Sequence, residues 1–368
     1  MHAADVALSV LLAAIIVVSL LANVLVLVCF VYNAEIRRQV PGLFVLNLTC
    51  CNLLLASSNM PLTVAGLLGH APPPGGHVLC QLAAFLDTFL TSNSMLSMAA
   101  LSIDRWVAVV FPLSYHSRMR RRDAVLALAY AWLHSLGFAV APACLSWLDY
   151  HRPTASCTLY NPRARASDGA ASSRAHFAAY TVALHALTFL LVLVVLCVTY
   201  LKVLQVARFH CKRIDVITMQ TLVLLVDIHP SVRQRCLEEQ RKRRQRATRK
   251  ISTFIGTFVV CFTPYVLTRV VELFVTVPIS PYWGVLCKSL AYSKAACDPF
   301  VYSLLRHQYR QTCSDIINRF LKRRSLNTSG QRQENGKLKK PVNSGNSEIS
   351  EKPEKPDKEE KTGTGSAV

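Results

Sequence analysis

Residues 80–112 are apolar except at a few depths, where Asp87, Asp104 and Arg105 carry charges. A helix over this stretch up to Arg105 would be about 37 Å long, slightly more than a hydrocarbon core of about 30 Å. Steps of three or four residues place Asp87, Ser94 and Arg105 on one stripe of that helix. Because lipid would leave the charges of Asp87 and Arg105 unsatisfied, the stripe must face protein. The chemistry indicated is charge pairing and hydrogen bonding inside a helix bundle.

The elements that position these side chains are long apolar runs. The chain has 368 residues, of which 52% are hydrophobic, and a formal net charge of +20. Seven runs reach the length of about 20 residues that a membrane-spanning helix needs. We therefore expect an all-α membrane protein, a seven-transmembrane helix bundle, with spans at residues 6–31, 40–68, 81–110, 124–148, 177–204, 251–275 and 283–305.

The distribution of Lys and Arg predicts how the spans are oriented. Basic residues are dense after the first, third and fifth runs, whereas the segments before the first run and after the second and sixth have none. Cytoplasmic loops carry the excess of Lys and Arg, so we expect a multi-pass plasma-membrane protein with an extracellular amino terminus and a cytoplasmic carboxyl terminus. Topology explains the basic loops better than nucleic-acid binding does. No removable signal peptide is indicated, because the first five residues have no Lys or Arg and the apolar run that follows is too long.

Three segments outside the spans are predicted to be cytoplasmic. Residues 205–246 are too polar to span and are expected to form the third cytoplasmic loop. The bundle is expected to cover residues 1–323 and to end in a short amphipathic helix, about 306–323, that lies against membrane lipids. On this helix Cys313 is a candidate for lipidation. Residues 324–368 lack core-forming side chains, which predicts a disordered tail.

The chain has 13 cysteines, most of them inside predicted spans, where they behave as small apolar residues. Two differ. Cys80 stands at the outer end of the third span, and Cys157 lies in the long loop after the fourth, both on the oxidising side of the membrane. A disulfide between them is therefore expected. It would hold this loop over the mouth of the bundle.

Several short motifs occur in the predicted spans and at their ends. They are Asp104-Arg105-Trp106, Trp132 with Pro142, Tyr200, Phe258 with Cys261-Phe262-Thr263-Pro264, and Asp298-Pro299-Phe300-Val301-Tyr302. With the seven spans and the two cysteines, their order and spacing resemble the rhodopsin-like G-protein coupled receptors over residues 6 to about 324. The resemblance implies a receptor that passes a signal to a heterotrimeric G protein, with no enzymatic activity and no cofactor.

Within this family, residues 218–236 and 291–310 are similar to a small group of orphan receptors. That similarity implies an orphan receptor with high ligand-independent activity that couples to the stimulatory G protein and raises cAMP. The sequence leaves its ligand unknown. Further expected partners are arrestin and kinases at the tail, and a PDZ domain that would bind the final Ser366-Ala367-Val368.

The resemblance also implies which residues take part in activation. Asp104 can hold the guanidinium of Arg105 by a charge-assisted hydrogen bond, and its release would let Arg105 meet the G protein. Many relatives add an acid at the base of span six, where this chain has Arg244. A cation there would repel Arg105, which favours the active state at rest. The other residues expected to take part in activation and coupling are Trp106, Tyr200, Phe258, Phe262, Pro264, Asp298, Pro299 and Tyr302.

A central polar cluster of Asn23, Asn52, Ser94 and Asp298 is also predicted. Relatives usually have the acid in span two and the amide in span seven, so Asn52 and Asp298 are an apparent exchange. A buried carboxylate needs compensation for lost hydration. Two alternatives remain open, namely Na⁺ bound at Asp298 or an Asp298 that is protonated or hydrogen-bonded. No other metal site is indicated.

Asp87 lies about 10 Å below Cys80 along the helix, where amine-binding relatives keep the acid that pairs with their ligand. Because Arg269 and Lys288 point inward at this depth, Asp87 is either a free amine anchor or part of an internal pair that holds helices three, six and seven. The predicted ligand-pocket residues are Asp87, His185, Tyr265, Arg269, Lys288 and Tyr292. Retinal binding is not expected, because Tyr292 stands where retinal-binding relatives have Lys and Lys294 is about 200° further round the helix.

A polytopic transporter or channel is the alternative function. Many transporters show two related halves with interrupted spans, and this sequence has no internal repeat. A channel would need a selectivity filter or a ring of charges, and no segment supplies one. The receptor is therefore the favoured interpretation.

Overall fold

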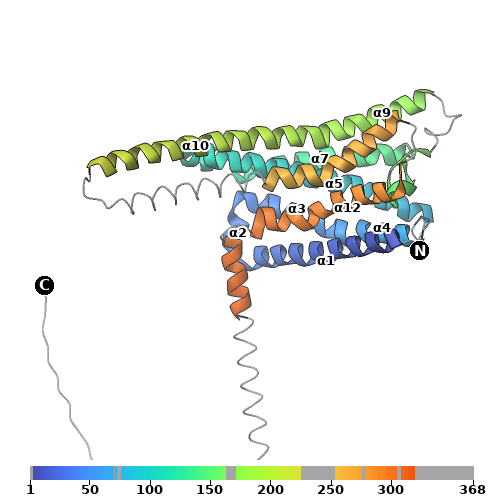
Figure 1. Cartoon of the computed structure of the whole chain (residues 1–368), viewed down its shortest axis with the longest axis horizontal. Helices are drawn as coiled ribbons and strands as arrows, with labels where there is room; N and C mark the ends of the chain where they lie inside the picture. The colour runs from blue at the N-terminus through green and yellow to red at the C-terminus, as the bar shows by residue number, and fades with distance from the viewer. Residues whose placement is uncertain are drawn as a thin grey trace, which may run out of the picture. The chain divides into compact units, whose positions relative to one another are not determined.

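A computed structural model describes residues 3–69, 71–72, 76–162, 171–224, 253–275, 279–304 and 308–319. The long helices run side by side (Figure 1). Their bounds are α1 (Ala3–Tyr32), α3 (Val40–Ser57), α4 (Asn59–Gly69), α5 (Gly76–Val110), α7 (Arg121–Cys144), α9 (Ala171–His185), α10 (Leu191–Leu224), the helix Thr253–Phe274 and α12 (Pro281–Asp298). Short helices α2 (Ala34–Arg38), η1 (Pro112–Ser114) and α6 (Tyr115–Arg118) follow α1 and α5. Residues 308–319 form a further helix within the predicted interfacial segment.

Breaks within the spans account for the larger number of helices. α3 and α4 form one span that is interrupted at Ser58, just before Pro61, whose ring removes a backbone donor. α9 and α10 are joined by the π-helical turn η3 (Ala186–Leu190), and α12 continues into a second π-helical turn, η4 (Pro299–Leu304). With α1, α5, α7 and the helix Thr253–Phe274, these make the predicted seven-helix bundle.

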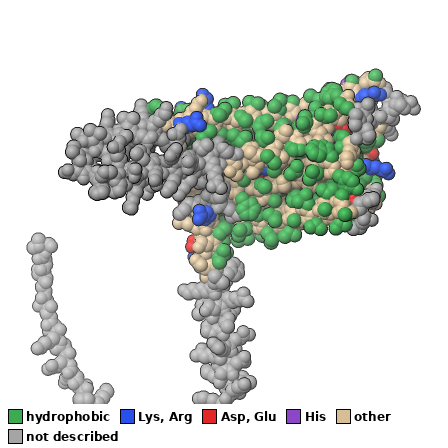
Figure 2. Space-filling model, viewed as in Figure 1, with side chains coloured by type: hydrophobic (Ala, Val, Ile, Leu, Met, Phe, Trp, Pro, Cys, Tyr) green, Lys and Arg blue, Asp and Glu red, His purple; other side chains and the backbone are tan. Residues whose placement is uncertain are grey.

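Apolar composition accounts for most of the spans. Five of the described helices are long and apolar enough to cross a membrane, and α5 becomes a sixth when it is joined to the bent segment Pro112–Arg118. α12 falls short of this hydropathy because its buried face carries Lys288, Lys294 and Asp298. Figure 2 shows hydrophobic side chains over the drawn face of the bundle, with Lys and Arg near its two ends. This is the surface that a lipid environment requires.

α5 is the central helix, as its polar stripe predicts. It packs against α3, α7, α10 and both strands of the extracellular loop. Asn47 joins three of the helices, because its Nδ2 donates to Ser97 Oγ of α5 at 2.8 Å and its Oδ1 accepts from Trp132 Nε1 of α7 at 2.9 Å. Amide side chains are satisfied in this way inside bundles, where water is excluded.

The fourth span ends earlier than predicted. The apolar run reaches Leu148, but α7 ends at Cys144, and Leu148 is the first residue of a strand. Ser146 has φ 55°, in the left-handed region, so the helix cannot continue through it. The backbone N–H of Trp147 bonds instead to the carbonyl of Pro142 at 2.8 Å.

A two-stranded hairpin covers the end of α5 at which the helix begins. Strands β1 (Leu148–His151) and β2 (Ser156–Leu159) pair antiparallel, and all four residues of β2 are buried. The predicted disulfide between Cys80 and Cys157 is confirmed, with a Cα–Cα distance of 5.3 Å. It joins β2 to the first turns of α5, so the hairpin is held over the mouth of the bundle.

Two glycines let this hairpin approach the helices closely. A Cβ on Gly66 of α4 would lie 2.5 Å from the carbonyl oxygen of Ala155, and one on Gly284 of α12 would lie closer still to that of Pro153. Tyr150 adds a hydrogen bond from its hydroxyl to the Gly66 carbonyl at 3.1 Å. Burial raises the pKa of Tyr150 more than the nearby Arg152 lowers it, which keeps this phenol protonated as a donor.

Several boundaries differ from the sequence prediction on the cytoplasmic side. α10 continues as helix to Leu224, 20 residues beyond the predicted end at Leu204, so the first part of the predicted loop 205–246 is helical. Arg244, the remainder of that loop and the predicted tail 324–368 lie outside the described residues. Tyr302 lies in η4, and its side chain is likewise outside the description.

Candidate functional site

A cavity lies below the hairpin, with an empty volume of about 880 Å³ that includes space open to solvent. Its walls come from α3, α4, α5, the α9–η3 segment, the helix Thr253–Phe274 and α12, and β2 contributes Thr158 and Leu159. The structure brings together all six predicted ligand-pocket residues here, namely Asp87, His185, Tyr265, Arg269, Lys288 and Tyr292. The cavity extends from the hairpin to Asp298 in the central cluster.

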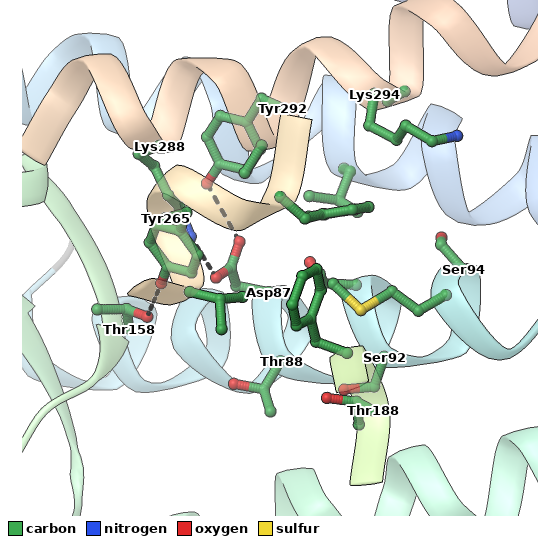
Figure 3. Close-up of a pocket in the computed structure, with 18 of the residues that line it drawn as sticks. Asp87, Thr88, Ser92, Ser94, Thr158, Thr188, Tyr265, Lys288, Tyr292 and Lys294 are labelled. Carbon is green, nitrogen blue, oxygen red and sulfur yellow. Dashed lines mark hydrogen bonds and ion pairs between the residues drawn. The ribbon is translucent and has the colours of Figure 1, made fainter. Parts of the chain in front are cut away.

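Asp87 is held by two side chains of α12. Lys288 Nζ lies 2.5 Å from Asp87 Oδ2, and the Tyr292 hydroxyl donates to Asp87 Oδ1 at 3.2 Å (Figure 3). Lys288 is 3% exposed and Asp87 5%, so both charges are removed from water. Such a pair persists only with further support. The rings of Tyr265 and Tyr292 supply it, because their centroids lie 4.8 and 4.9 Å from the ammonium nitrogen.

Of the two alternatives left open by the sequence, the geometry is therefore that of an internal pair. Lys288 and Tyr292 join α12 to α5, and helix 253–274 takes part through the ring of Tyr265. Tyr265 is held in turn by the hairpin, since its hydroxyl lies 3.4 Å from Thr158 Oγ1. An amine ligand would have to displace Lys288 before it could reach the carboxylate.

Arg269 does not pair with Asp87. Its Nη1 lies 2.6 Å from Glu272 Oε2, and its Nη2 donates to the Leu159 carbonyl of β2. Glu272 also contacts His151 of β1, with 2.8 Å between Oε1 and Nε2. These buried contacts fasten the hairpin to the helix Thr253–Phe274. Sequence reasoning missed His151, because its partner Glu272 is 121 residues away and no local spacing connects them.

The central cluster contains a residue that the sequence analysis placed elsewhere. Asn52 Nδ2 donates to Asp298 Oδ2 at 3.1 Å, and Asn23 Nδ2 donates to the Ala295 carbonyl at 2.9 Å. The other carboxylate oxygen, Oδ1, forms an ion pair with Lys294 Nζ. Lys294 is not among the residues that the sequence predicts for this cluster. Its spacing of four residues from Asp298 was the signal that would have found this pair.

His185 and Ser94 line the cavity without joining these ion pairs. His185 bonds through Nδ1 to the Thr181 carbonyl of its own helix at 2.7 Å. Ser94, the fourth predicted member of the central cluster, faces the cavity from α5 but makes no hydrogen bond to Asn23, Asn52 or Asp298. The cluster is therefore built around Asp298, Asn52 and Lys294.

Arg105 lies at the other end of α5. Its Nη2 is 2.6 Å and its Nε 3.0 Å from Asp104 Oδ2, while Tyr115 donates to Asp104 Oδ1 at 2.7 Å. Asp104 is fully buried, and the side chain of Arg105 is 39% exposed. The structure thus has the predicted Asp104–Arg105 bond, and part of the Arg105 side chain remains exposed at this end of the bundle.

Aromatic side chains contact one another beside the cavity and further along the bundle. The Phe258 ring stacks on Phe189 at 5.5 Å between centroids and meets Phe262, which lines the cavity, at 5.3 Å. Closer to the cytoplasm, Tyr200 and Phe254 lie 4.5 Å apart. Pro264 lies one turn before Thr268, whose hydroxyl bonds to the Pro264 carbonyl at 2.7 Å. Trp106 contacts Phe111, and Pro299 opens η4.

The helix 308–319 contacts the carboxyl end of α1. The Sγ atoms of Cys313 and Cys29 lie 3.2 Å apart, and Asn33 Nδ2 donates to Thr312 Oγ1 at 2.9 Å. Cys313 is partly buried by these contacts. An acyl chain on Cys313 would therefore have to leave beside α1.

Comparisons with known proteins agree with this architecture. The family "7 transmembrane receptor (rhodopsin family)" matches residues 22–302. The chain is 68% identical to human "G-protein coupled receptor 26", over 85% of this chain and 90% of that receptor. It is 50% identical to human "G-protein coupled receptor 78", over 85% and 84% of the two chains. A more distant relative is the rat "Histamine H2 receptor", 24% identical over 93% of this chain and 92% of that one.

The family match covers most of the chain, and the high-identity relatives are covered almost throughout, so the expected fold and family are confirmed and a transporter or channel is excluded. The chain belongs to the rhodopsin family of seven-transmembrane receptors, multi-pass plasma-membrane proteins that are not enzymes and that signal through heterotrimeric G proteins.

Proposed function

We propose that this receptor signals without a ligand and that it raises cAMP through the stimulatory G protein. The observation that carries the proposal is the buried contact between Lys288 and Asp87. We place the amino terminus outside the cell and the carboxyl terminus in the cytoplasm, in accordance with the Lys and Arg distribution. We also propose residues 1–323 as the bundle, 205–246 as its third cytoplasmic loop and 324–368 as its tail.

The Lys288–Asp87 contact resembles the contact of a bound amine. One distant relative is named for histamine, an amine, and is 24% identical to this chain. Here a primary ammonium of α12 lies on the carboxylate of α5, with aromatic rings around it. Aromatic groups of this kind are a common environment for ligand ammonium groups. We infer that Lys288 is a built-in substitute for an amine and that it favours the active arrangement of α5 and α12.

The cytoplasmic end supports the same proposal. The only partner of the Arg105 guanidinium that the structure gives among the described residues is Asp104, its neighbour on α5. This bond does not join α5 to the helix Thr253–Phe274, so it does not by itself hold those helices together. Arg244, if it lies at the base of that helix as the sequence indicates, would add repulsion. A difference of a few kcal/mol between states is enough to populate the active one.

Further partners and sites belong to this proposal. Arrestin and kinases would act at the tail, and the final Ser366-Ala367-Val368 would bind a PDZ domain through its carboxylate. Cys313 would carry a lipid that anchors the helix 308–319. Asp104, Arg105, Tyr200, Phe258 and Tyr302 would take part in coupling.

The test is the cAMP level in the absence of added ligand, measured against the number of receptors at the cell surface. We expect cAMP to rise in proportion to surface receptor, and Arg105→Ala to abolish the rise at equal surface number. The matched control is Arg118→Ala, which alters an exposed arginine at the same end of the molecule. Equal cAMP with wild type and Arg105→Ala would contradict the proposal.

A further inference from the structure

Asp298 is the second buried carboxylate of the cavity, and both of its oxygens are engaged. It is 2% exposed, with Oδ1 paired to Lys294 and Oδ2 accepting from Asn52. A carboxylate at this depth must be neutralised by a proton, by a dissolved cation or by a fixed cationic side chain. In this arrangement the ammonium of Lys294 takes the place beside Oδ1 where a dissolved cation would bind. The residues present therefore do not fit a sodium site.

We propose that Lys294 is the fixed counter-cation of the central cluster and makes the receptor independent of Na⁺. Lys294 is 2% exposed, and its ammonium is paired with the Asp298 carboxylate. Breaking such a buried pair from one side leaves the other charge uncompensated, which is far more costly than removing both. The pair is thus a structural requirement of α12, whatever the receptor signals to.

The position of the pair along the chain has a mechanical consequence. Lys294 and Asp298 are four residues apart on α12, so the counter-charge moves with the carboxylate when the helix moves. A dissolved cation shared by Asp298 and Ser94 would instead join α12 to α5. In this receptor Asp298 is linked to α3 by the hydrogen bond that the uncharged amide of Asn52 donates. The central cluster therefore does not act as a cation-operated clamp.

The test is the thermal unfolding midpoint of the purified receptor at about 0.15 M NaCl, compared with N-methylglucamine chloride at equal ionic strength. For the wild type we expect the same midpoint in both salts. In Lys294→Met, Asp298, Asn52 and Ser94 would present oxygen ligands of the kind that hard cations prefer. Sodium should then raise the midpoint by about 2–4 °C, and adding Ser94→Ala should reduce this gain. The control is Lys202→Met, an exposed lysine of α10.

If Lys294→Met does not fold, a second comparison tests whether Lys294 is the counter-cation of Asp298. Asp298→Asn alone removes the carboxylate that faces Lys294 and keeps the buried ammonium, whereas the double variant Asp298→Asn with Lys294→Met removes both charges. We expect the double variant to reach the cell surface in larger amount than Asp298→Asn. A wild-type midpoint that rises in sodium, or single and double variants that reach the surface equally, would overturn the proposal. None of these measurements depends on cAMP or on the identity of the G protein.

Discussion

At the scale of single residues, α12 neutralises both buried carboxylates of the cavity with its own lysines. Lys288 faces Asp87 of α5 across the cavity, and Lys294 faces Asp298 within α12. The two pairs differ in what they join. The first connects two helices and lies where a ligand could compete, whereas the second stays inside one helix. Only the first is therefore suited to control the arrangement of α5 against α12.

Removal of Lys288 tests whether its contact with Asp87 controls ligand-free signalling. We expect Lys288→Ala to lower ligand-free cAMP at equal surface expression. If Lys288 stabilises the active state by about 1.4 kcal/mol, its loss would lower the ratio of active to inactive receptor about tenfold. A small primary amine such as n-butylamine, which restores an ammonium on a four-carbon chain, should recover part of the signal by binding Asp87.

The amine experiment has two controls. Lys202→Ala, an exposed lysine on α10, should signal like the wild type and show no response to n-butylamine. The double variant Lys288→Ala with Asp87→Asn should have lost the site for the amine. Unchanged basal cAMP in Lys288→Ala, or equal amine responses in the wild type, would contradict a built-in ammonium.

Arg244 gives a second prediction at this scale. Because a carboxylate at the base of span six would attract Arg105, Arg244→Glu should lower ligand-free cAMP. Arg244→Lys keeps the positive charge and should signal like the wild type. The measurement is cAMP per surface receptor, and equal values for the Glu and Lys variants would refute the repulsion.

At the scale of elements, the extracellular hairpin is the part that closes the cavity. Its attachments are the disulfide of Cys157 to α5, the contacts of Glu272 with His151, and the close approach to Gly66 and Gly284. They come from α4, α5, α12 and the helix Thr253–Phe274. The hairpin therefore fixes the separation of four spans at the mouth of the bundle.

Gly284 provides a direct test of this packing. A methyl group there would clash with the carbonyl of Pro153, so we expect Gly284→Ala to cost about 1–3 kcal/mol. The thermal unfolding midpoint of the purified receptor should fall by at least about 2–4 °C. Gly137→Ala is the matched control, because a Cβ on Gly137 of α7 meets no atom within 4 Å. An unchanged midpoint for Gly284→Ala would show that the hairpin is not held tightly.

The sequence predicted the spans well where they are long apolar runs, because burial in lipid imposes that composition. It failed at ends that depend on backbone geometry. The run up to Leu148 continues past Cys144, yet the positive φ of Ser146 ends α7 and starts the hairpin. On the cytoplasmic side, hydropathy falls after Leu204, whereas α10 continues to Leu224 because a helix that leaves the membrane need not unfold.

The residues of the cavity also divide into those that local spacing predicts and those whose contacts depend on the packing of distant segments. Side chains on one helical stripe, such as Asp87 and Ser94, were predicted to face inward, and they do. The choice between Lys288 and Arg269 as the partner of Asp87 depends on how two helices pack, which no local spacing decides. His151 and Glu272 meet only because the hairpin folds back over the bundle. Non-local contacts of this kind had to come from the structure.

At the scale of the whole molecule, the receptor's own lysines stand where a ligand ammonium and a dissolved cation would otherwise bind. Phe189 and Phe262 both line the cavity and contact Phe258, and at the other end of α5 Arg105 is held from its own helix. The proposed ligand-free signalling is the main consequence expected of this arrangement. Cells can supply unrecognised ligands, so a purified system tests it most directly.

The decisive measurement is the rate of guanine-nucleotide exchange on purified stimulatory G protein, with the purified receptor in lipid nanodiscs and no ligand present. The account predicts a rate well above that of the G protein alone, and a return to that basal rate with Arg105→Ala. An exchange rate with the wild-type receptor equal to that of the G protein alone would contradict it.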